Sequence, residues 1–312
     1  MRVPSVVAVA LLVVGCKDAP SAAPDAGPAL VEVLPPPSAT VADTVAVPSA
    51  TPPPDAPRPT RCPAEMVFVR DTVCVDRWEA QLVDKNTGKL LSPYYPPMRK
   101  LAQRLHDEWE TARFTRGGPT AQAVPVPPLP AWQTEVDVEP MAVARAGVVP
   151  AGYVSGNLAE RACKNAGKRL CTSAEWVTAC RGASDRPYPY GDSYQTGKCN
   201  IFRSKHPAAV LHDDASVGHL DPRLNTVKEG SDPLLRPTGG TPTCSSQWGD
   251  DAIYDMNGNL DEWVEDEKGR FQGGFFSRSK TDGCQSKVTA HPKGYFDYST
   301  GVRCCSDPTP RD

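Results

Sequence analysis

Near the end of the 312-residue chain stands Asp255-Met256-Asn257-Gly258-Asn259-Leu260-Asp261-Glu262-Trp263, in which carboxylate and amide side chains surround a glycine turn. Three other segments accompany it: Ala166-Gly167-Lys168-Arg169-Leu170-Cys171-Thr172-Ser173-Ala174-Glu175-Trp176, Tyr188-Pro189-Tyr190-Gly191-Asp192 and Gly301-Val302-Arg303-Cys304. Many Gly, Pro, Asn and Asp residues separate the short apolar pieces of this half of the chain. That pattern favours an irregular, loop-rich α+β domain over a bundle of long helices.

The four segments, in this order, resemble the formylglycine-generating enzyme family, also called the sulfatase-modifying factor family. One segment alone would be a weak signal, whereas four in order at suitable spacing are specific. The resemblance extends from Cys62 to Cys305 and is strong only after about Pro150. It implies a disulfide-braced α+β fold related to C-type lectins.

Local patterns predict several elements of this domain. Residues 66–69 and 73–76 are expected to form two strands around a turn. Residues 98–112 are expected to form a helix, followed by a proline-rich surface loop at 124–128. Asn157-Leu158-Ala159-Glu160 resembles a capping box, which predicts a helix that continues to Ala166. Thr172-Ser173-Ala174-Glu175 is a second such motif and predicts a helix that ends near Gly182.

The first residues have the features of an exported lipoprotein. A basic start and an apolar run at 3–14 precede Gly15-Cys16, so residues 1–15 are predicted to be a signal peptide. A retained transmembrane anchor is the weaker alternative, because a spanning helix needs about 20 apolar residues. Val13-Val14-Gly15-Cys16 resembles a lipobox, which makes Cys16 the lipidated residue, although a chance cysteine is the other interpretation.

Residues 16–61 are rich in Pro and Ala and contain no aromatic residue, so they are expected to form a disordered tether before the domain at 62–312. Lysine directly after Cys16 resembles the sorting signal for the outer membrane, with the periplasmic and the exposed leaflet both left open. The net charge is -3, from 34 basic and 37 acidic residues, without long runs of either sign. Nucleic acid is therefore not an expected partner, and attachment to the membrane is expected through the lipid.

The cysteine count indicates a disulfide framework. Removing Cys16 from the eleven cysteines leaves ten, an even number in an oxidising compartment. Cys62 and Cys74 bracket the first strand pair and are expected to form a local bridge. The family resemblance implies the bridges Cys163–Cys304 and Cys180–Cys284. Pairing among Cys171, Cys199, Cys244 and Cys305 stays open: Cys171 with Cys305 and Cys199 with Cys244 is one option, and a redox switch at Cys304-Cys305 is another.

The resemblance also implies two calcium sites, and the segment at 255–262 supplies the hard oxygen ligands that calcium prefers. The first site would use Asp255, Gly258, Leu260 and Glu262. The second would use Asn200 and Ile201 with Asp214 or its neighbour Asp213. The alternative is a turn whose Asn and Asp side chains only cap backbone groups.

Copper is not expected. The enzymes of the family hold copper between two cysteines, and the matching positions here are Arg278 and Gly283. A guanidinium cannot replace the soft thiolate that copper(I) needs. Three of the five histidines, His206, His212 and His219, share one polar segment in which solvated side chains are the expected state.

A ligand pocket is expected around Arg278, Phe275, Phe276 and Trp263, on segments that match the family's substrate groove, although Trp263 is favoured as a core residue. These observations favour a lipid-anchored, calcium-stabilised, non-catalytic binding or structural module with an unidentified protein, peptide or glycan ligand. The alternative is an oxidoreductase of the same superfamily with a different metal or ligand set.

Overall fold

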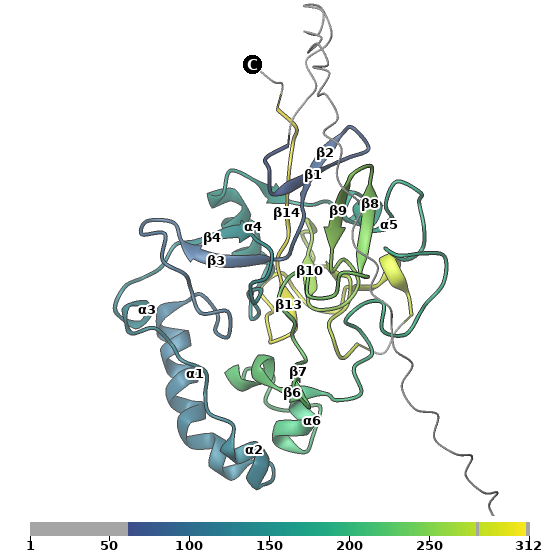
Figure 1. Cartoon of the computed structure of the whole chain (residues 1–312). Coiled ribbons are helices and arrows are strands. Elements are labelled where there is room, and N and C mark those ends of the chain that lie inside the picture. Colours follow the sequence, from purple (N-terminus) through teal and green to yellow (C-terminus); the bar gives the residue numbers. More distant parts are fainter. Residues whose placement is uncertain (1–61, 279–280, 310–312) are drawn as a thin grey trace, which may run out of the picture. The chain divides into compact units, whose positions relative to one another are not determined.

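A four-stranded sheet joins the beginning, the middle and the end of the domain. The computed structural model describes residues 62–278 and 281–309 (Figure 1). In it, β1 (Met66–Val69) and β2 (Val73–Asp76) form the predicted hairpin. β2 pairs with β14 (Cys304–Ser306), which also pairs with β5 (Arg169–Leu170). The strands near Cys62 therefore belong to the same fold as the carboxyl-terminal half.

The second four-stranded sheet contains the carboxyl half of the 255–263 motif. β10 (Asp261–Trp263) lies between β11 (Phe271–Gln272) and β13 (Thr300–Gly301), and β12 (Lys287–Val288) pairs with β11. All three residues of β10 are buried. Trp263 packs edge-on against Phe271 and donates from Nε1 to the Val154 carbonyl at 2.7 Å. It is a core residue, as favoured from the sequence.

Three two-stranded ribbons complete the strands of the described part. They are β3 (Ala80–Asp84) with β4 (Pro140–Ala144), β6 (Lys228–Glu229) with β7 (Asp232–Pro233), and β8 (Ser245–Trp248) with β9 (Asp251–Tyr254). β3 is tied to the rest of the domain, because the Ala80 amide donates to the Val302 carbonyl at 2.9 Å.

The two helices that follow the predicted caps begin differently. α5 (Ser173–Arg181) has the predicted capping box between Thr172 and Glu175 and ends at Gly182. α4 (Gly156–Asn165) is capped by Ser155, whose Oγ accepts from the Leu158 amide at 3.3 Å, so the cap predicted at Asn157 is wrong. The physical reason is a long-range contact: the Asn157 amide donates to the Lys293 carbonyl, which holds that residue inside the first turn.

The remaining helices pack against different parts of the core. They are α1 (Arg99–Ala112), α2 (Pro119–Ala123), α3 (Ala131–Glu135) and α6 (Pro207–His212), with short 3-10 turns at Arg113–Thr115, Pro222–Thr226 and Gly283–Gln285. Figure 1 shows α1, α2 and α3 together on one side of the sheets. No helix in the described part is both long and apolar enough to cross a membrane.

The proline-rich segment at 124–128 is not wholly a surface loop, which corrects the sequence prediction. Val126 is buried in a cluster with Leu105 and Trp109 of α1. The Tyr95 hydroxyl donates to the Pro127 carbonyl at 2.6 Å. The segment is needed as a cover, because α1 would otherwise expose its apolar face to water.

The described residues contain five disulfides, which include both pairs that the resemblance implied and the local Cys62–Cys74 bridge. They are Cys62–Cys74, Cys163–Cys304, Cys171–Cys305, Cys180–Cys284 and Cys199–Cys244. The open pairing is thereby resolved: Cys304 bonds to Cys163 of α4, and Cys305 bonds to Cys171, directly after β5, so the vicinal cysteines do not bond to each other. A native bridge typically contributes about 2–5 kcal/mol. Cys16, the predicted signal peptide and the predicted tether lie outside the described residues.

Candidate functional site

A cleft of about 210 Å³ opens beside the second sheet, where Phe271 and Val288 form part of its wall. Two of the four predicted pocket residues, Arg278 and Phe275, line it. The other polar and aromatic groups of the lining include His206, His219, His291, Tyr295, Asp297 and Tyr298. Phe276 and Trp263 are both buried, in two different clusters of the hydrophobic core, so neither belongs to the cleft wall.

Arg278 is held at the cleft by a buried carboxylate. Its Nη2 donates to Oδ2 of Asp261, a residue of β10 with no exposed surface. The other oxygen of Asp261 accepts from the Gly274 amide at 3.0 Å. Burial raises the pKa of Asp261 to about 6, and the Arg278 charge partly offsets this rise. The guanidinium carbon also lies 5.2 Å from the centre of the Phe275 ring, within cation–π range.

Two hydrogen-bonded pairs, one of them with a histidine, form another part of the polar wall. The Tyr298 hydroxyl lies 3.0 Å from Nε2 of His206, and the Tyr295 hydroxyl donates to Oδ2 of Asp297 at 2.5 Å. Burial, and then the nearby His219, lower the pKa of His206, which favours its neutral form. Nδ1 of His206 is buried without a hydrogen-bond partner among the described residues. The cleft therefore offers a cation, a neutral imidazole and aromatic faces to a ligand.

The expectation that the histidines of the polar segment are solvated is wrong for two of them. His206 is half-buried in the cleft. The His212 side chain is fully enclosed, with Nε2 3.2 Å from Oδ2 of the buried Asp221. The apolar residues at 207–211 were a sequence signal for this burial. They pack α6 against the core, and the histidines at both ends of α6 are therefore partly or fully buried.

Glu262 of the 255–263 motif belongs to a buried cluster of charged side chains. Both carboxylate oxygens of Glu262 accept from Arg303, at 2.7 to 3.0 Å, and Oε2 also accepts from Nε1 of Trp176 at 2.6 Å. Arg303 has no exposed surface and also donates to the main-chain carbonyls of Asp76 and Tyr254. Glu262 is thus saturated by charged and neutral donors.

Two further carboxylates lie near this pair and have no buried cation of their own. Oδ2 of Asp255 accepts from the Gly239 amide at 2.6 Å, and Glu79 accepts from Asn259 and from the Leu260 amide. Burial raises the pKa of Asp255 to about 6. Burial, and then repulsion by Asp255 and Glu262, raise the pKa of Glu79 well above its usual range. Among the described residues, Arg303 is the fully buried cation near these three carboxylates, and the partly exposed Arg236, which pairs with Asp232, also acts on Asp255. The cluster therefore has surplus negative charge unless protons or a bound cation neutralise it.

The residues of the two predicted calcium sites fit calcium in part. Within 62–278 and 281–309, no three His, Cys, Asp or Glu side chains gather as metal ligands. The charge surplus at Asp255 suits a divalent cation, whereas Glu262 has no free oxygen to give. Oδ1 of Asn200 is buried without a described hydrogen-bond partner, as a hard-ligand oxygen would be before it meets a cation. Ile201 is buried, and Asp214 lies on an exposed loop, where it accepts from Ser216.

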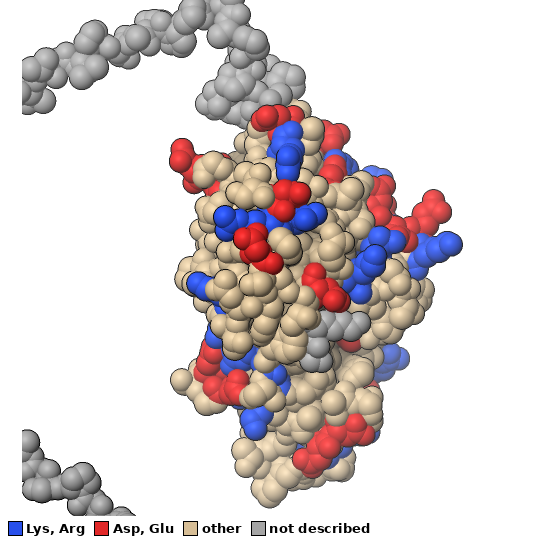
Figure 2. Space-filling model, turned by 90° about the vertical axis from the view of Figure 1, so that its right-hand side faces the viewer, with Lys and Arg blue, Asp and Glu red and all other residues tan. Residues whose placement is uncertain are grey.

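The outer surface shows no concentration of one charge on the face in Figure 2, where acidic and basic side chains lie interspersed. Acidic and basic side chains of the domain also form ion pairs at the surface, such as Arg99 with Asp137 and Lys293 with Glu160. Exposed pairs of this kind contribute little to stability. The arrangement gives this face no broad field that would attract a polyanion.

Comparison with known proteins agrees with the four motifs. A family model described as "Sulfatase-modifying factor enzyme 1-like domain" matches residues 130–307, which are more than half of the chain. The inactive C-alpha-formylglycine-generating enzyme 2 of Bos taurus is 29% identical over 116 residues, which are 37% of this chain and 32% of that protein. The formylglycine-generating enzyme of Streptomyces coelicolor is 33% identical over 121 residues, or 38% and 32% of the two chains.

The chain spans about a third of the length of these curated relatives. Among solved structures, PvdO from Pseudomonas aeruginosa has 20% sequence identity and a TM-score of 0.32, covering 54% of this chain and 64% of that one. Because the family model covers most of the domain and contains all four motifs, the chain belongs to the family of sulfatase-modifying factor enzyme 1-like proteins.

Proposed function

We propose that this chain is a non-catalytic binding module, anchored outside the cytoplasm by a lipid on Cys16. The observation that carries the proposal is Arg278, which occupies the position of the first copper thiolate of the related oxidases. It pairs with the buried Asp261 and lines the cleft. A permanently protonated guanidinium repels a metal cation and attracts anionic or polar ligand groups.

The cysteines support the same proposal. The second thiolate position is Gly283, and its neighbour Cys284 is bonded to Cys180. All ten cysteines in the described part lie in disulfides, so none of them supplies a thiolate in this state. Copper(I) binds to soft thiolates, and copper chemistry is therefore not part of the proposed function.

The ligand of the proposed module is a peptide or glycan that fits the cleft at Arg278. The test is an array of peptides and glycans probed with the domain at 61–312 and with an Arg278→Gln/Asp261→Asn double variant. The double variant removes the cation without leaving a buried charge unpaired. Loss of one defined set of signals in the double variant supports the proposal. Identical signals for both proteins, or no signal on any array, would contradict it.

Calcium stabilisation is the second part of the proposal. It is supported by the surplus negative charge around Asp255 and by the unpaired oxygen of Asn200. Chelation at neutral pH should lower the melting temperature, added calcium should restore it, and magnesium should restore it less, because magnesium demands stricter octahedral geometry. Asp255→Ala should remove most of this response. Superimposable melting curves in excess chelator and in calcium would rule the site out.

Anchoring through Cys16 is proposed from the lipobox, with the outer membrane as the destination. Replacement of Cys16 by Ser should move the protein from the membrane fraction to the soluble fraction and abolish its labelling by palmitate. Retention of the variant in the membrane fraction would show that another segment anchors the chain.

An oxidoreductase with a different metal remains the second candidate, and one observation favours it. Three histidines, His206, His219 and His291, line the same cleft. Imidazole nitrogens suit iron, copper and zinc. These side chains would have to rearrange, since in the described part of the chain they do not form a group that could hold a metal ion.

A further inference from the structure

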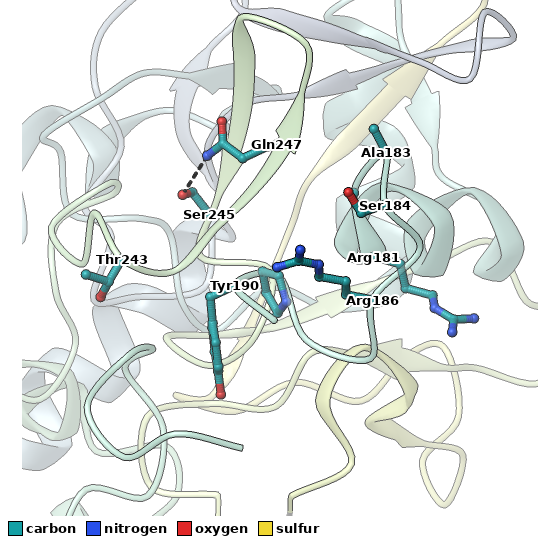
Figure 3. A pocket seen from close by; sticks show the side chains of 10 residues that line it. Arg181, Ala183, Ser184, Arg186, Tyr190, Thr243, Ser245 and Gln247 are labelled. Carbon is teal, nitrogen blue, oxygen red and sulfur yellow. Dashed lines mark hydrogen bonds between the residues drawn. The ribbon is translucent and has the colours of Figure 1, made fainter. Parts of the chain in front are cut away.

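A second cleft, of about 340 Å³, lies between the loop that follows α5 and the ribbon strand β8 (Figure 3). Its size is within the range of about 300–1,000 Å³ that is usual for ligand pockets. The lining is polar and basic and includes Arg181, Arg186, Tyr190, Thr243, Ser245 and Gln247. No acidic residue is part of the lining.

The two arginines of this second cleft differ in their partners. Nε of Arg181 lies 3.3 Å from a carboxylate oxygen of Asp185, which offsets its charge. Arg186 is exposed and pairs with no carboxylate in the described ranges. Figure 3 shows the Arg186 side chain reaching toward Tyr190. The second cleft therefore has one guanidinium that is free to bind a carboxylate through two parallel hydrogen bonds.

The free edge of β8 faces the same space. The Gln247 carbonyl accepts from the Ala183 amide at 2.9 Å, so it points away from β9 and toward the loop. The Tyr254 amide of β9 donates to the Arg77 carbonyl, and so it does not bond to Ser245, its register partner. Hydrogen-bonded and non-hydrogen-bonded pairs alternate along an antiparallel ribbon. The amide and the carbonyl of Ser245 consequently point into the second cleft, whereas the loop at Gly182 and Ala183 already packs against the main chain of Gln247.

We propose that this second cleft binds a short extended peptide that carries a carboxylate. The peptide main chain adds to the open part of the β8 edge through the amide and the carbonyl of Ser245, beside the place where the loop contacts Gln247, and its carboxylate binds Arg186. An edge strand with unpaired main-chain groups is a template for such addition, and pockets beside the edge then select side chains or a terminus. A sugar acid would engage Arg186 but has no main chain to align with β8.

The test uses four fluorescein-labelled peptides and the intact domain, with affinity measured by anisotropy. The peptides are Thr-Val-Thr-Val with a free carboxyl terminus, its amide, the amide Thr-Val-Asp-Val, and the free acid with its central amide nitrogens methylated. β-Branched residues favour the extended form that the strand edge requires. The first peptide should bind if a terminus is recognised, and the Asp peptide if a side chain is. Amidation without Asp, and N-methylation, should each weaken binding about tenfold or more.

Arg186→Gln should weaken binding of the charged peptide by a similar factor, and it touches no buried contact. Arg104→Gln, an equal change of charge on an exposed face of α1, is the matched control and should leave affinity unchanged. The Arg278→Gln/Asp261→Asn variant should also bind normally, which separates this cleft from the one at Arg278. Binding that is insensitive to N-methylation or to Arg186→Gln overturns the proposal. Failure of all four peptides to bind at millimolar concentration also overturns it.

Discussion

Replacement of Arg303 by Leu should lower the free energy of unfolding by about 3–5 kcal/mol at neutral pH, because it leaves buried charge uncompensated. In the described part of the chain, Arg303 is the only guanidinium that contacts Glu262, and its charge also acts on Glu79 and Asp255. The main-chain carbonyls of Asp76 and Tyr254 would also lose their donor. Urea unfolding of the purified domain measures the change.

Two variants make this first prediction specific to the buried cluster. Glu262→Leu combined with Arg303→Leu should be more stable than Arg303→Leu alone, since the double variant removes the carboxylate that the single variant leaves unpaired. Arg99→Leu removes an arginine whose ion pair with Asp137 is exposed, and it should cost less than about 1 kcal/mol. Equal losses for Arg303→Leu and Arg99→Leu would mean that the buried cluster does not stabilise the fold.

Asp255→Asn should become progressively more stable than the wild-type domain as pH rises from about 4 to 7 in chelator. Burial raises the folded-state pKa of Asp255 to about 6, above its usual value of 3.8. Below about pH 3 the carboxyl is protonated in both states, so the wild type and the variant should have the same stability. As pH rises, the unfolded chain releases the proton first, and the folded wild type loses stability until pH passes 6. The full difference should be about 2–3 kcal/mol.

The same pair of proteins separates protons from calcium as the neutralising charge. In excess calcium the wild type should recover stability at pH 7, because a bound cation favours the ionised carboxylate. The advantage of Asp255→Asn should then shrink or reverse. A constant difference between the two proteins across the whole pH range would contradict the raised pKa. A pH-dependent difference that calcium does not alter would leave protonation as the explanation and refute the calcium site.

The sequence predicted those parts of the fold that depend on neighbouring residues. The hairpin at β1 and β2, the helix α1 and the capping box between Thr172 and Glu175 are local, and each forms as expected. The start of α4 was misplaced because Ser155 and Asn157 are both good caps. The choice between them depends on a contact with Lys293, more than a hundred residues away.

One residue of the candidate site, Arg278, could be predicted from its charge. Arg278 stood out because a cation after apolar residues needs a partner, and the structure supplies Asp261. Phe275 and Phe276 are chemically identical, and only the backbone after Gly274 decides that one faces the cleft and the other the core. The second cleft had no sequence signal, because it is formed when the free edge of β8 meets the loop after α5.

We propose that a permanent cation, Arg278, stands where the related oxidases hold copper. A copper(I) titration of the native domain, combined with a count of reactive thiols before and after unfolding, tests this replacement. We predict no stoichiometric copper and no reactive thiol in either state without reductant. Stoichiometric copper held by a reactive Cys284 and a second thiol would show that the copper centre is still present.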